Sequence, residues 1–366
     1  MKRVWLMASL GAVGVVLLVA ATACATSGCS TIAYYHQSVN GHLDLVRAAR
    51  PVAEVIADPA TEATLKARLE LSQRIRDFAV AELKLPDNTS YRRFADLKRS
   101  AAVWNVVAAP ELSLRLETWC FPVVGCVSYR GYFDRDEAEA FAKPLRERGL
   151  EVNVYGVPAY STLGKLPFNW LADPLLNTFI GWPEGELARI VIHELSHQVA
   201  YADGDTVFNE SFATAVERIG GRRWLEVHAG AAAREEYARL DARREDFRAF
   251  TRKVRDELDA VYRSADSDET KRAAKAAVMA RMRADYEVMK RERWAGFSGY
   301  DGWFARANNA SFGVLAAYNE QVPLFERLFE REGRDFTRFY AEVRRLAALP
   351  KAERAAAMKS LETKAE

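Results

Sequence analysis

The stretch VIHELSHQVAY, residues 191–201, predicts a buried helix that carries two histidines on one face. Positions four apart lie one turn from each other, so the imidazoles of His193 and His197 can point at the same ion. Glu194 is rotated about the helix axis by one residue, and its carboxylate can reach a water on that ion rather than the ion itself. The neighbouring positions are apolar, and a buried His-Glu-His group without a metal would need several hydrogen-bond partners.

The spacing HExxH is typical of zinc-dependent peptidases, in which the histidines bind the metal and the glutamate acts as the general base. An ordinary helix in which the motif occurs by chance is the alternative, and a third ligand distinguishes the two. Asp203 lies six residues after His197, but Ala200 stands where a glycine would turn the chain back. Glu210 lies thirteen residues after His197, in the next predicted helix, and two histidines with one glutamate form a known catalytic zinc site. The spacing therefore favours Glu210 over Asp203.

The rest of the chain predicts a helix-dominated α+β protein, with a zincin-like catalytic core around this helix. Short β-branched and aromatic segments between residues 100 and 160 predict a small sheet. A helix begins at Asn209, and Gly220-Gly221 are expected to end it. Two long, highly charged segments within residues 230–294 are broken near residues 264–268, and they predict a helical hairpin.

We expect a single domain after an N-terminal signal. Its consecutive parts are a helical N-terminal part (29–99), an α+β catalytic core (100–225), a charged helical hairpin (226–300) and a helical C-terminal part (301–366). The chain has 366 residues, of which 49% are hydrophobic and 28% charged, so it can bury a core of its own. Its net charge of +2 gives no electrostatic reason to expect a nucleic-acid partner.

Residues 1–28 are typical of the signal peptide of a bacterial lipoprotein. Two basic residues precede an apolar run over residues 4–23, and small residues and cysteines follow it. A retained transmembrane anchor is the alternative, because the run is nearly long enough to span a membrane. Two cysteines are candidates for the lipid attachment: Cys24, near the end of this segment, and Cys29, directly after it.

Cysteine parity favours Cys29 as the lipid-attachment site. Cleavage before Cys29 leaves Cys120 and Cys126 as a pair, whereas cleavage before Cys24 leaves an odd thiol. The pair encloses a short loop, FPVVG, and a disulfide there suits an oxidising compartment; two buried free thiols are the alternative. Ser30 stands in place of the aspartate associated with inner-membrane retention, so we expect a lipid anchor in the outer membrane, facing the periplasm.

Several motifs, taken in their order along the chain, resemble those of one protein family. They are YRGYF, GVPAYSTLG, DPLLNTF, HELSHQ, DTVFNESFATAVE, and NNA followed by AAYNEQVPLF. This set is similar to that of the bacterial "putative aminopeptidases", a group of predicted lipid-anchored zinc peptidases. The resemblance implies His193, His197 and Glu210 as ligands of one zinc ion, and a peptide as the substrate. It also implies Glu194 as the general base and supports Cys29 as the anchor in the cell envelope.

A peptidase site of this kind also requires a group that stabilises the oxyanion. Tyr160 in AYSTLG and Tyr318 after NNA are the phenols that the motifs place best, and His228 is an imidazole candidate. An ordinary core or surface position is the alternative for each. For the whole protein, the alternative is a non-enzymatic envelope protein with a structural or vestigial metal site. Three protein ligands beside a glutamate favour an open, catalytic site, because structural sites usually have four.

Overall fold

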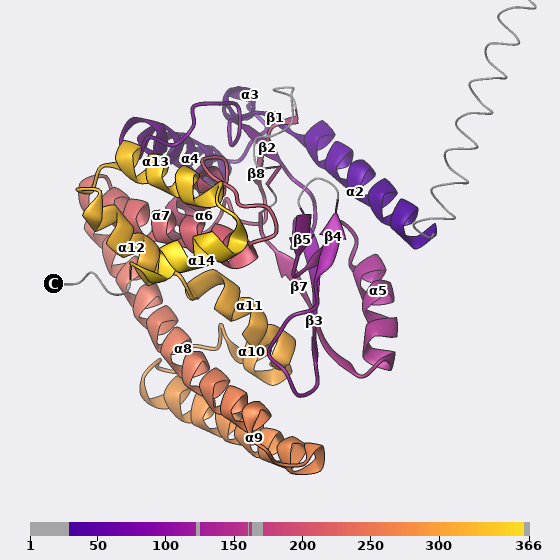
Figure 1. The fold of residues 1–366 in the computed structure, drawn as a ribbon. Helices are drawn as coiled ribbons and strands as arrows, with labels where there is room; N and C mark the ends of the chain where they lie inside the picture. Colours follow the sequence, from indigo (N-terminus) through magenta and orange to yellow (C-terminus); the bar gives the residue numbers. More distant parts are fainter. Residues whose placement is uncertain (1–28, 122–124, 160, 163–170, 362–366) are drawn as a thin grey trace, which may run out of the picture.

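The computed structural model describes residues 29–121, 125–159, 161–162 and 171–361, and these form the helix-dominated α+β fold that the sequence predicts (Figure 1). The helices are α2 (Cys29–Ala48), α3 (Val52–Ala57), α4 (Ala63–Ala81), α5 (Arg135–Glu147), α6 (Glu184–Ser196), α7 (Thr206–Val227), α8 (Ala231–Arg263), α9 (Asp268–Glu292), α10 (Asp301–Arg306), α11 (Asn309–Asn319), α12 (Val322–Arg331), α13 (Phe336–Ala347) and α14 (Lys351–Lys359). The strands are β1 (Arg50–Pro51), β2 (Arg93–Ala95), β3 (Val103–Pro110), β4 (Trp119–Phe121), β5 (Gly125–Val127), β6 (Arg130–Tyr132), β7 (Leu150–Val157) and β8 (Leu175–Leu176). The zincin-like arrangement of the core and the division into domains stay predictions.

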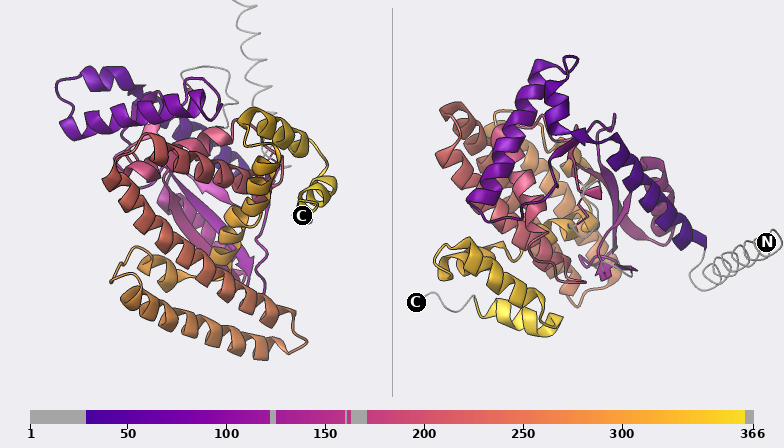
Figure 2. Two further views of the ribbon diagram at one scale, coloured as in Figure 1. Left: turned by 90° about the vertical axis from the view of Figure 1, so that its left-hand side faces the viewer. Right: turned by 90° about the horizontal axis from the view of Figure 1, so that it is seen from above.

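The main sheet is antiparallel, with the strand order β6-β3-β7, and helices cover both of its faces (Figure 2). Successive side chains of β3 point to opposite faces, as in any strand. Val106 and Ala108 lie in an apolar cluster with α5, whereas Val107 and Ala109 lie in a cluster with Ala310 of α11. A strand buried on both faces reads as a continuous apolar run, which is why the segment around β3 was recognisable as a strand.

Two smaller sheets complete the strands of the described chain. The three-stranded sheet β1-β2-β8 pairs Phe94 with Leu175, and its strands are too short to show a period in the sequence. The hairpin β4-β5 places Cys120 directly opposite Cys126, and a disulfide joins them. The expected pairing of these two cysteines is therefore present in the structure.

The charged helical hairpin is present at the predicted place. α8 and α9 lie side by side and project from the rest of the fold, and the turn between them falls at residues 264–267 (Figures 1 and 2). The inner side of the hairpin packs against α10 and α11 in a cluster of its own, which includes Phe247, Tyr286, Trp294 and Phe304. This packing ties the hairpin to the body of the protein by apolar contacts.

The expected end of the second site helix at Gly220-Gly221 is wrong, because α7 continues through both glycines to Val227. A Cβ atom on Gly220 would lie 2.5 Å from Cδ1 of Leu83, and one on Gly221 would lie 2.9 Å from Cγ of Arg189. The glycines are required for close packing of α7 against α6 and against Leu83, which follows α4, and not for a left-handed turn. This close approach sets the distance between the two helices that carry the candidate site.

Gly220→Ala should therefore destabilise the protein although alanine is the better helix former. We expect the free energy of unfolding to fall by about 1–3 kcal/mol, because the added methyl group overpacks a buried contact. Gly181→Ala is the matched control, since a Cβ there meets no atom within 4 Å, and it should change stability by less than about 0.5 kcal/mol. Denaturant unfolding measures both; a gain of stability in Gly220→Ala would contradict the packing argument.

Candidate metal centre

The two histidines of the opening stretch lie at the C-terminal end of α6. His193 is in the last turn, and His197 is the residue that caps the helix. The helix therefore ends before the end of the stretch 191–201 that was predicted to be helical, because the chain turns after Ser196. His197 keeps helical backbone angles, with φ −59° and ψ −21°, so the spacing of one turn between the histidines is preserved.

The connection from α6 to α7 folds the chain back so that Glu210 faces the histidines. The side chain of Asn209 accepts a hydrogen bond from the Ala202 N–H (2.8 Å) and donates one to its carbonyl (2.9 Å). Asp205 caps α7 by accepting from the Phe208 N–H at 3.2 Å. These bonds hold both ends of the turn, and they fix the first turns of α7 beside the end of α6.

Three buried atoms face one another at the meeting point of these helices. The Nε2 atoms of His193 and His197 are 3.2 Å apart. Oε2 of Glu210 lies 3.4 Å from the first and 3.7 Å from the second. Bonds of about 2.1 Å to a tetrahedral metal ion separate any two ligand atoms by about 3.4 Å. The three side chains therefore form a group that could hold a metal ion without rearrangement.

The hydrogen bonding of this group also fits a cation. Within the described part of the chain, Oε2 of Glu210 is buried and has no hydrogen-bond partner. The whole residue is only 9% exposed. An unpaired carboxylate oxygen in the interior costs free energy unless an ion or a proton compensates it. Burial alone would lower the pKa of His193, but the nearby carboxylates of Glu210 and Glu217 raise it well above its usual value. Carboxylates that stabilise a proton on His193 would equally stabilise a metal cation.

Glu217 also belongs to the candidate site, although no motif in the sequence indicated it. Its Oε2 lies 2.9 Å from Nδ1 of His193, and its other oxygen pairs with Arg189. Burial would raise the pKa of the Glu217 carboxyl, but the charges of Arg189 and His193 outweigh it and hold the pKa at about 2. A carboxylate on the far nitrogen of a ligand histidine fixes the tautomer and the ring orientation. The sequence could have indicated Glu217 through its spacing, because this residue lies two helical turns after Glu210 and therefore on the same face of α7.

Glu217→Gln should weaken metal binding without removing a ligand. We expect the affinity for zinc to fall by about 10–100-fold, because His193 loses the carboxylate that orients it. Glu226→Gln on the exposed side of α7 is the control and should leave the affinity unchanged. Competition with a chromophoric chelator measures both, and an unchanged affinity in Glu217→Gln would rule out the orienting role.

Glu194 lines a cavity of about 730 Å³ that also reaches the three ligand-type residues. Burial raises the pKa of Glu194 to about 7; the charge of His193 opposes this shift, and the carboxylate of Glu210 adds to it. A carboxyl group with a pKa near neutrality can accept and return a proton under physiological conditions. The structure thus places Glu194 beside the candidate metal position, in contact with space that a substrate can enter.

The structure separates the three candidates for the oxyanion group. Tyr318 of α11 lines the same cavity, and its ring stacks on that of His193 at 6.3 Å between centroids. Tyr160 lies outside the described residues. His228 caps the other end of α7, where it lies 3.1 Å from a carboxylate oxygen of Glu82 and stacks on Trp224, away from the cavity. Tyr318 is therefore the candidate that the fold brings to the site.

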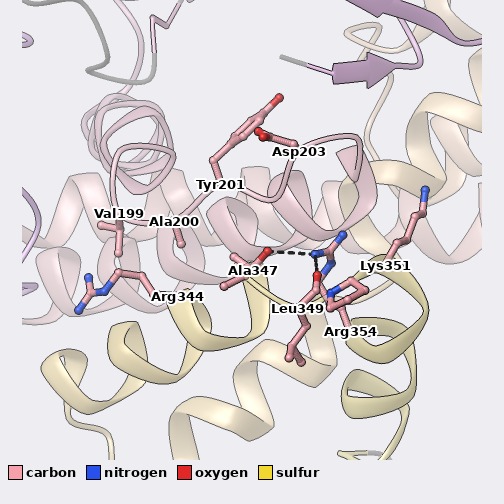
Figure 3. A pocket seen from close by; sticks show the side chains of 11 residues that line it. Val199, Ala200, Tyr201, Asp203, Arg344, Ala347, Leu349, Lys351 and Arg354 are labelled. Atoms are coloured by element: carbon pink, nitrogen blue, oxygen red, sulfur yellow. Dashed lines mark hydrogen bonds between the residues drawn. The ribbon is translucent and has the colours of Figure 1, made fainter. Parts of the chain in front are cut away.

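Asp203, the rival third ligand, lies elsewhere. It lines a second cavity beside α13 and α14, together with Tyr201, Lys351 and Arg354 (Figure 3). Arg354 donates there to the carbonyls of Ala347 and Leu349 (Figure 3), and it also pairs with Asp205. Among the described residues, the ligand-type group around the histidines contains Glu210 and not Asp203.

These features define a class: a helix-dominated α+β protein that could hold one metal ion in the wall of a cavity large enough for a substrate. The chain belongs to the family described as "Putative aminopeptidase", whose model matches residues 33–358. Neither a curated protein nor a solved structure matches the chain. The family confirms the resemblance drawn from the motifs, and its description indicates a peptidase acting on peptides.

Proposed function

We propose that this protein is a zinc-dependent peptidase, an aminopeptidase by its family, that hydrolyses peptide bonds in the bacterial cell envelope. The observation that carries the proposal is the set of three ligand atoms, 3.2–3.7 Å apart, in the wall of a cavity that Glu194 also lines. Two histidines and one glutamate are a donor set of catalytic zinc sites, and three protein ligands leave one position open. His193, His197 and Glu210 would hold the ion.

The residues of the chain then have distinct roles. When bound, zinc would lower the pKa of a coordinated water toward neutrality and polarise the peptide carbonyl. Glu194, which lines the cavity beside the three ligands, accepts a proton from the attacking water and passes it to the leaving amine. Glu217 accepts a hydrogen bond from the Nδ1–H of His193, so that the Nε2 lone pair of this histidine faces the cavity. The Tyr318 hydroxyl donates to the oxyanion that forms on the carbonyl.

Tyr318→Phe should lower the rate of peptide hydrolysis by about 100-fold with little change in zinc content, because an oxyanion donor is lost and the ligands remain. Tyr340→Phe is the matched control, since Tyr340 lies on α13, is buried in the hydrophobic core and does not line the cavity. Steady-state kinetics with one cleavable peptide compares the variants. A Tyr318→Phe protein with full activity would assign the oxyanion to another donor.

Metal analysis combined with an unbiased peptide-library digestion tests the proposed function. We expect one zinc ion per chain, and cleavage that a chelator abolishes and added zinc restores. Mass spectrometry of the digest shows whether residues are removed one at a time from the N-terminus or bonds are cut internally. A protein that binds zinc stoichiometrically and cleaves no peptide in the library would support the structural-metal alternative instead.

We also propose a lipid anchor at Cys29 in the outer membrane, with the folded chain in the periplasm. The lipoprotein-like start of the chain supports it, and the Cys120–Cys126 disulfide is typical of an oxidising compartment. None of the helices in the described residues is both long and apolar enough to cross a membrane. Intact mass of the mature N-terminus tests the anchor: acylation of Cys24, or no lipid, would contradict it.

A further inference from the structure

The cavity of the metal centre has a basic part formed by α6, α7 and α8. Four arginines line it there, namely Arg189, Arg218, Arg244 and Arg248. Two of them have close carboxylate partners inside the fold. Arg189 pairs with Glu217, and Arg244 lies 2.6 Å from Glu186 and 2.7 Å from Asp241. These two arginines are therefore structural, and the other two require a separate explanation.

Arg218 and Arg248 lack such partners in the described part of the chain. Nη2 of Arg218 donates to Oδ1 of Asn319 at 2.9 Å, but its Nε is buried without a hydrogen-bond partner. The nearest carboxylate of Arg248 belongs to Glu245 at 4.0 Å, and that side chain is 70% exposed, so the pair is weak. Burial lowers the pKa of both guanidinium groups. The carboxylates of Glu217 and Glu326 oppose this shift at Arg218, whereas the charge of Arg218 adds to it at Arg248, where Asp241 opposes it. Two partly dehydrated cations thus repel each other in the wall of one cavity.

A carboxylate from outside would relieve this arrangement. The carboxylates of the described chain that line the cavity are Glu194, Glu210 and Glu217, and each already faces the histidines or Arg189. A guanidinium group binds a carboxylate through two parallel hydrogen bonds, and such charge-assisted bonds are roughly twice as strong as neutral ones. The unmatched charge of the cavity is therefore complementary to an anionic group on its ligand.

Arg218 is a neighbour in sequence of residues at the candidate metal centre, and Arg248 lines the same cavity. Arg218 follows Glu217, whose carboxylate contacts His193, and its acceptor Asn319 follows Tyr318, whose ring stacks on His193. Beside Arg248, Phe247 and Tyr300 line the same cavity with their rings stacked at 4.3 Å between centroids. A ligand group held by both arginines would therefore be part of the same peptide whose scissile bond lies at the metal centre.

We propose that Arg218 and Arg248 bind a carboxylate of the peptide substrate, so that the site selects peptides that carry one a few residues from the cleaved bond. The carboxylate is the free C-terminus of a short peptide or the side chain of an acidic residue. This inference rests on the proposed peptidase function, and it adds the substrate class: short or acidic peptides rather than internal segments of neutral chains.

Calorimetric titration of the zinc-loaded Glu194→Gln protein tests the proposal, because binding can then be measured without cleavage. The ligands are three pentapeptides of matched sequence: a free acid, its C-terminal amide, and an amide with one internal aspartate. We expect the free acid, the aspartate-containing amide, or both to bind at least about tenfold more tightly than the neutral amide. Arg218→Gln and Arg248→Gln, added to the same protein, should remove that difference.

Two further variants serve as controls. Arg252→Gln removes the same charge from an exposed position of α8 and should keep the difference between the peptides. Arg218→Lys keeps a cation and should keep part of the difference, which separates the lost charge from a folding defect. Thermal unfolding of every variant checks that the fold is intact.

The outcomes separate this proposal from the proposed function. A stronger free acid assigns the site to a C-terminus, and a stronger aspartate-containing amide assigns it to an acidic side chain. Equal binding of the three peptides, no binding at all, or a difference that persists in both arginine variants would overturn the carboxylate site. If wild-type protein cleaves peptides without such a preference, only this inference fails. If the preference is present and wild-type protein cleaves nothing, the carboxylate site stands and the peptidase function fails.

Discussion

Glu194→Gln should abolish peptide hydrolysis while the protein keeps one zinc ion per chain. The substitution preserves the size of the side chain but removes the group that accepts the proton of the attacking water. General-base catalysis contributes about 10²–10⁴-fold to a rate, so we expect a loss within this range in kcat. Zinc content by mass spectrometry and initial rates on one cleavable peptide, measured on the same preparation, give both quantities.

The matched control is Glu226→Gln, which makes the same change at an exposed position of α7. It should leave the rate and the zinc content unchanged. If Glu194→Gln also loses zinc, Glu194 is a ligand and the division of roles between the residues of the HExxH motif is wrong here. If Glu194→Gln keeps its activity, another group is the base.

Glu210→Ala should have the opposite signature, a loss of zinc and of activity together. The variant removes one of three protein ligands, so the remaining pair of histidines should bind the ion more than about 100-fold more weakly. This loss is larger than the one expected for Glu217→Gln, which removes no ligand. Metal competition with a chromophoric chelator measures the affinity. Excess zinc should restore part of the activity, because Glu194 is still present.

Asp203→Ala is the control for this variant, because Asp203 was the rival ligand and lines a different cavity. It should bind zinc like the wild type. The reverse result, with zinc lost in Asp203→Ala and kept in Glu210→Ala, would require the connection between α6 and α7 to refold around the metal.

The features that the sequence predicted share a local cause. The helical hairpin was recognisable from two long periodic segments, and the turn at residues 264–267 follows from a serine cap at Ser267, which accepts from the Thr270 N–H. The pair His193 and His197 follows from helical spacing alone. Glu210 was inferred from its distance along the chain to the next helix. That helix begins at Thr206, earlier than the expected start at Asn209, and Glu210 lies in its first turns.

The features that the sequence did not predict depend on contacts between distant residues. Gly220-Gly221 resembled a helix stop, and only the proximity of Leu83 and Arg189 explains why the helix continues. Strands β2 and β8 are defined by their pairing across about eighty residues, which no local period reveals. Glu217 and Arg218 resembled ordinary charges on an exposed face, since their roles arise from the helices packed against α7.

The central claim is that His193, His197 and Glu210 bind one zinc ion. A crystal structure of the zinc-loaded protein, with anomalous diffraction measured on both sides of the zinc absorption edge, tests it most directly. We expect a single anomalous peak within about 2.0–2.2 Å of the two Nε2 atoms and of a Glu210 carboxylate oxygen, and no direct bond to Glu194. A fully loaded protein whose peak lies on Asp203, or at any site away from the two histidines, would contradict it.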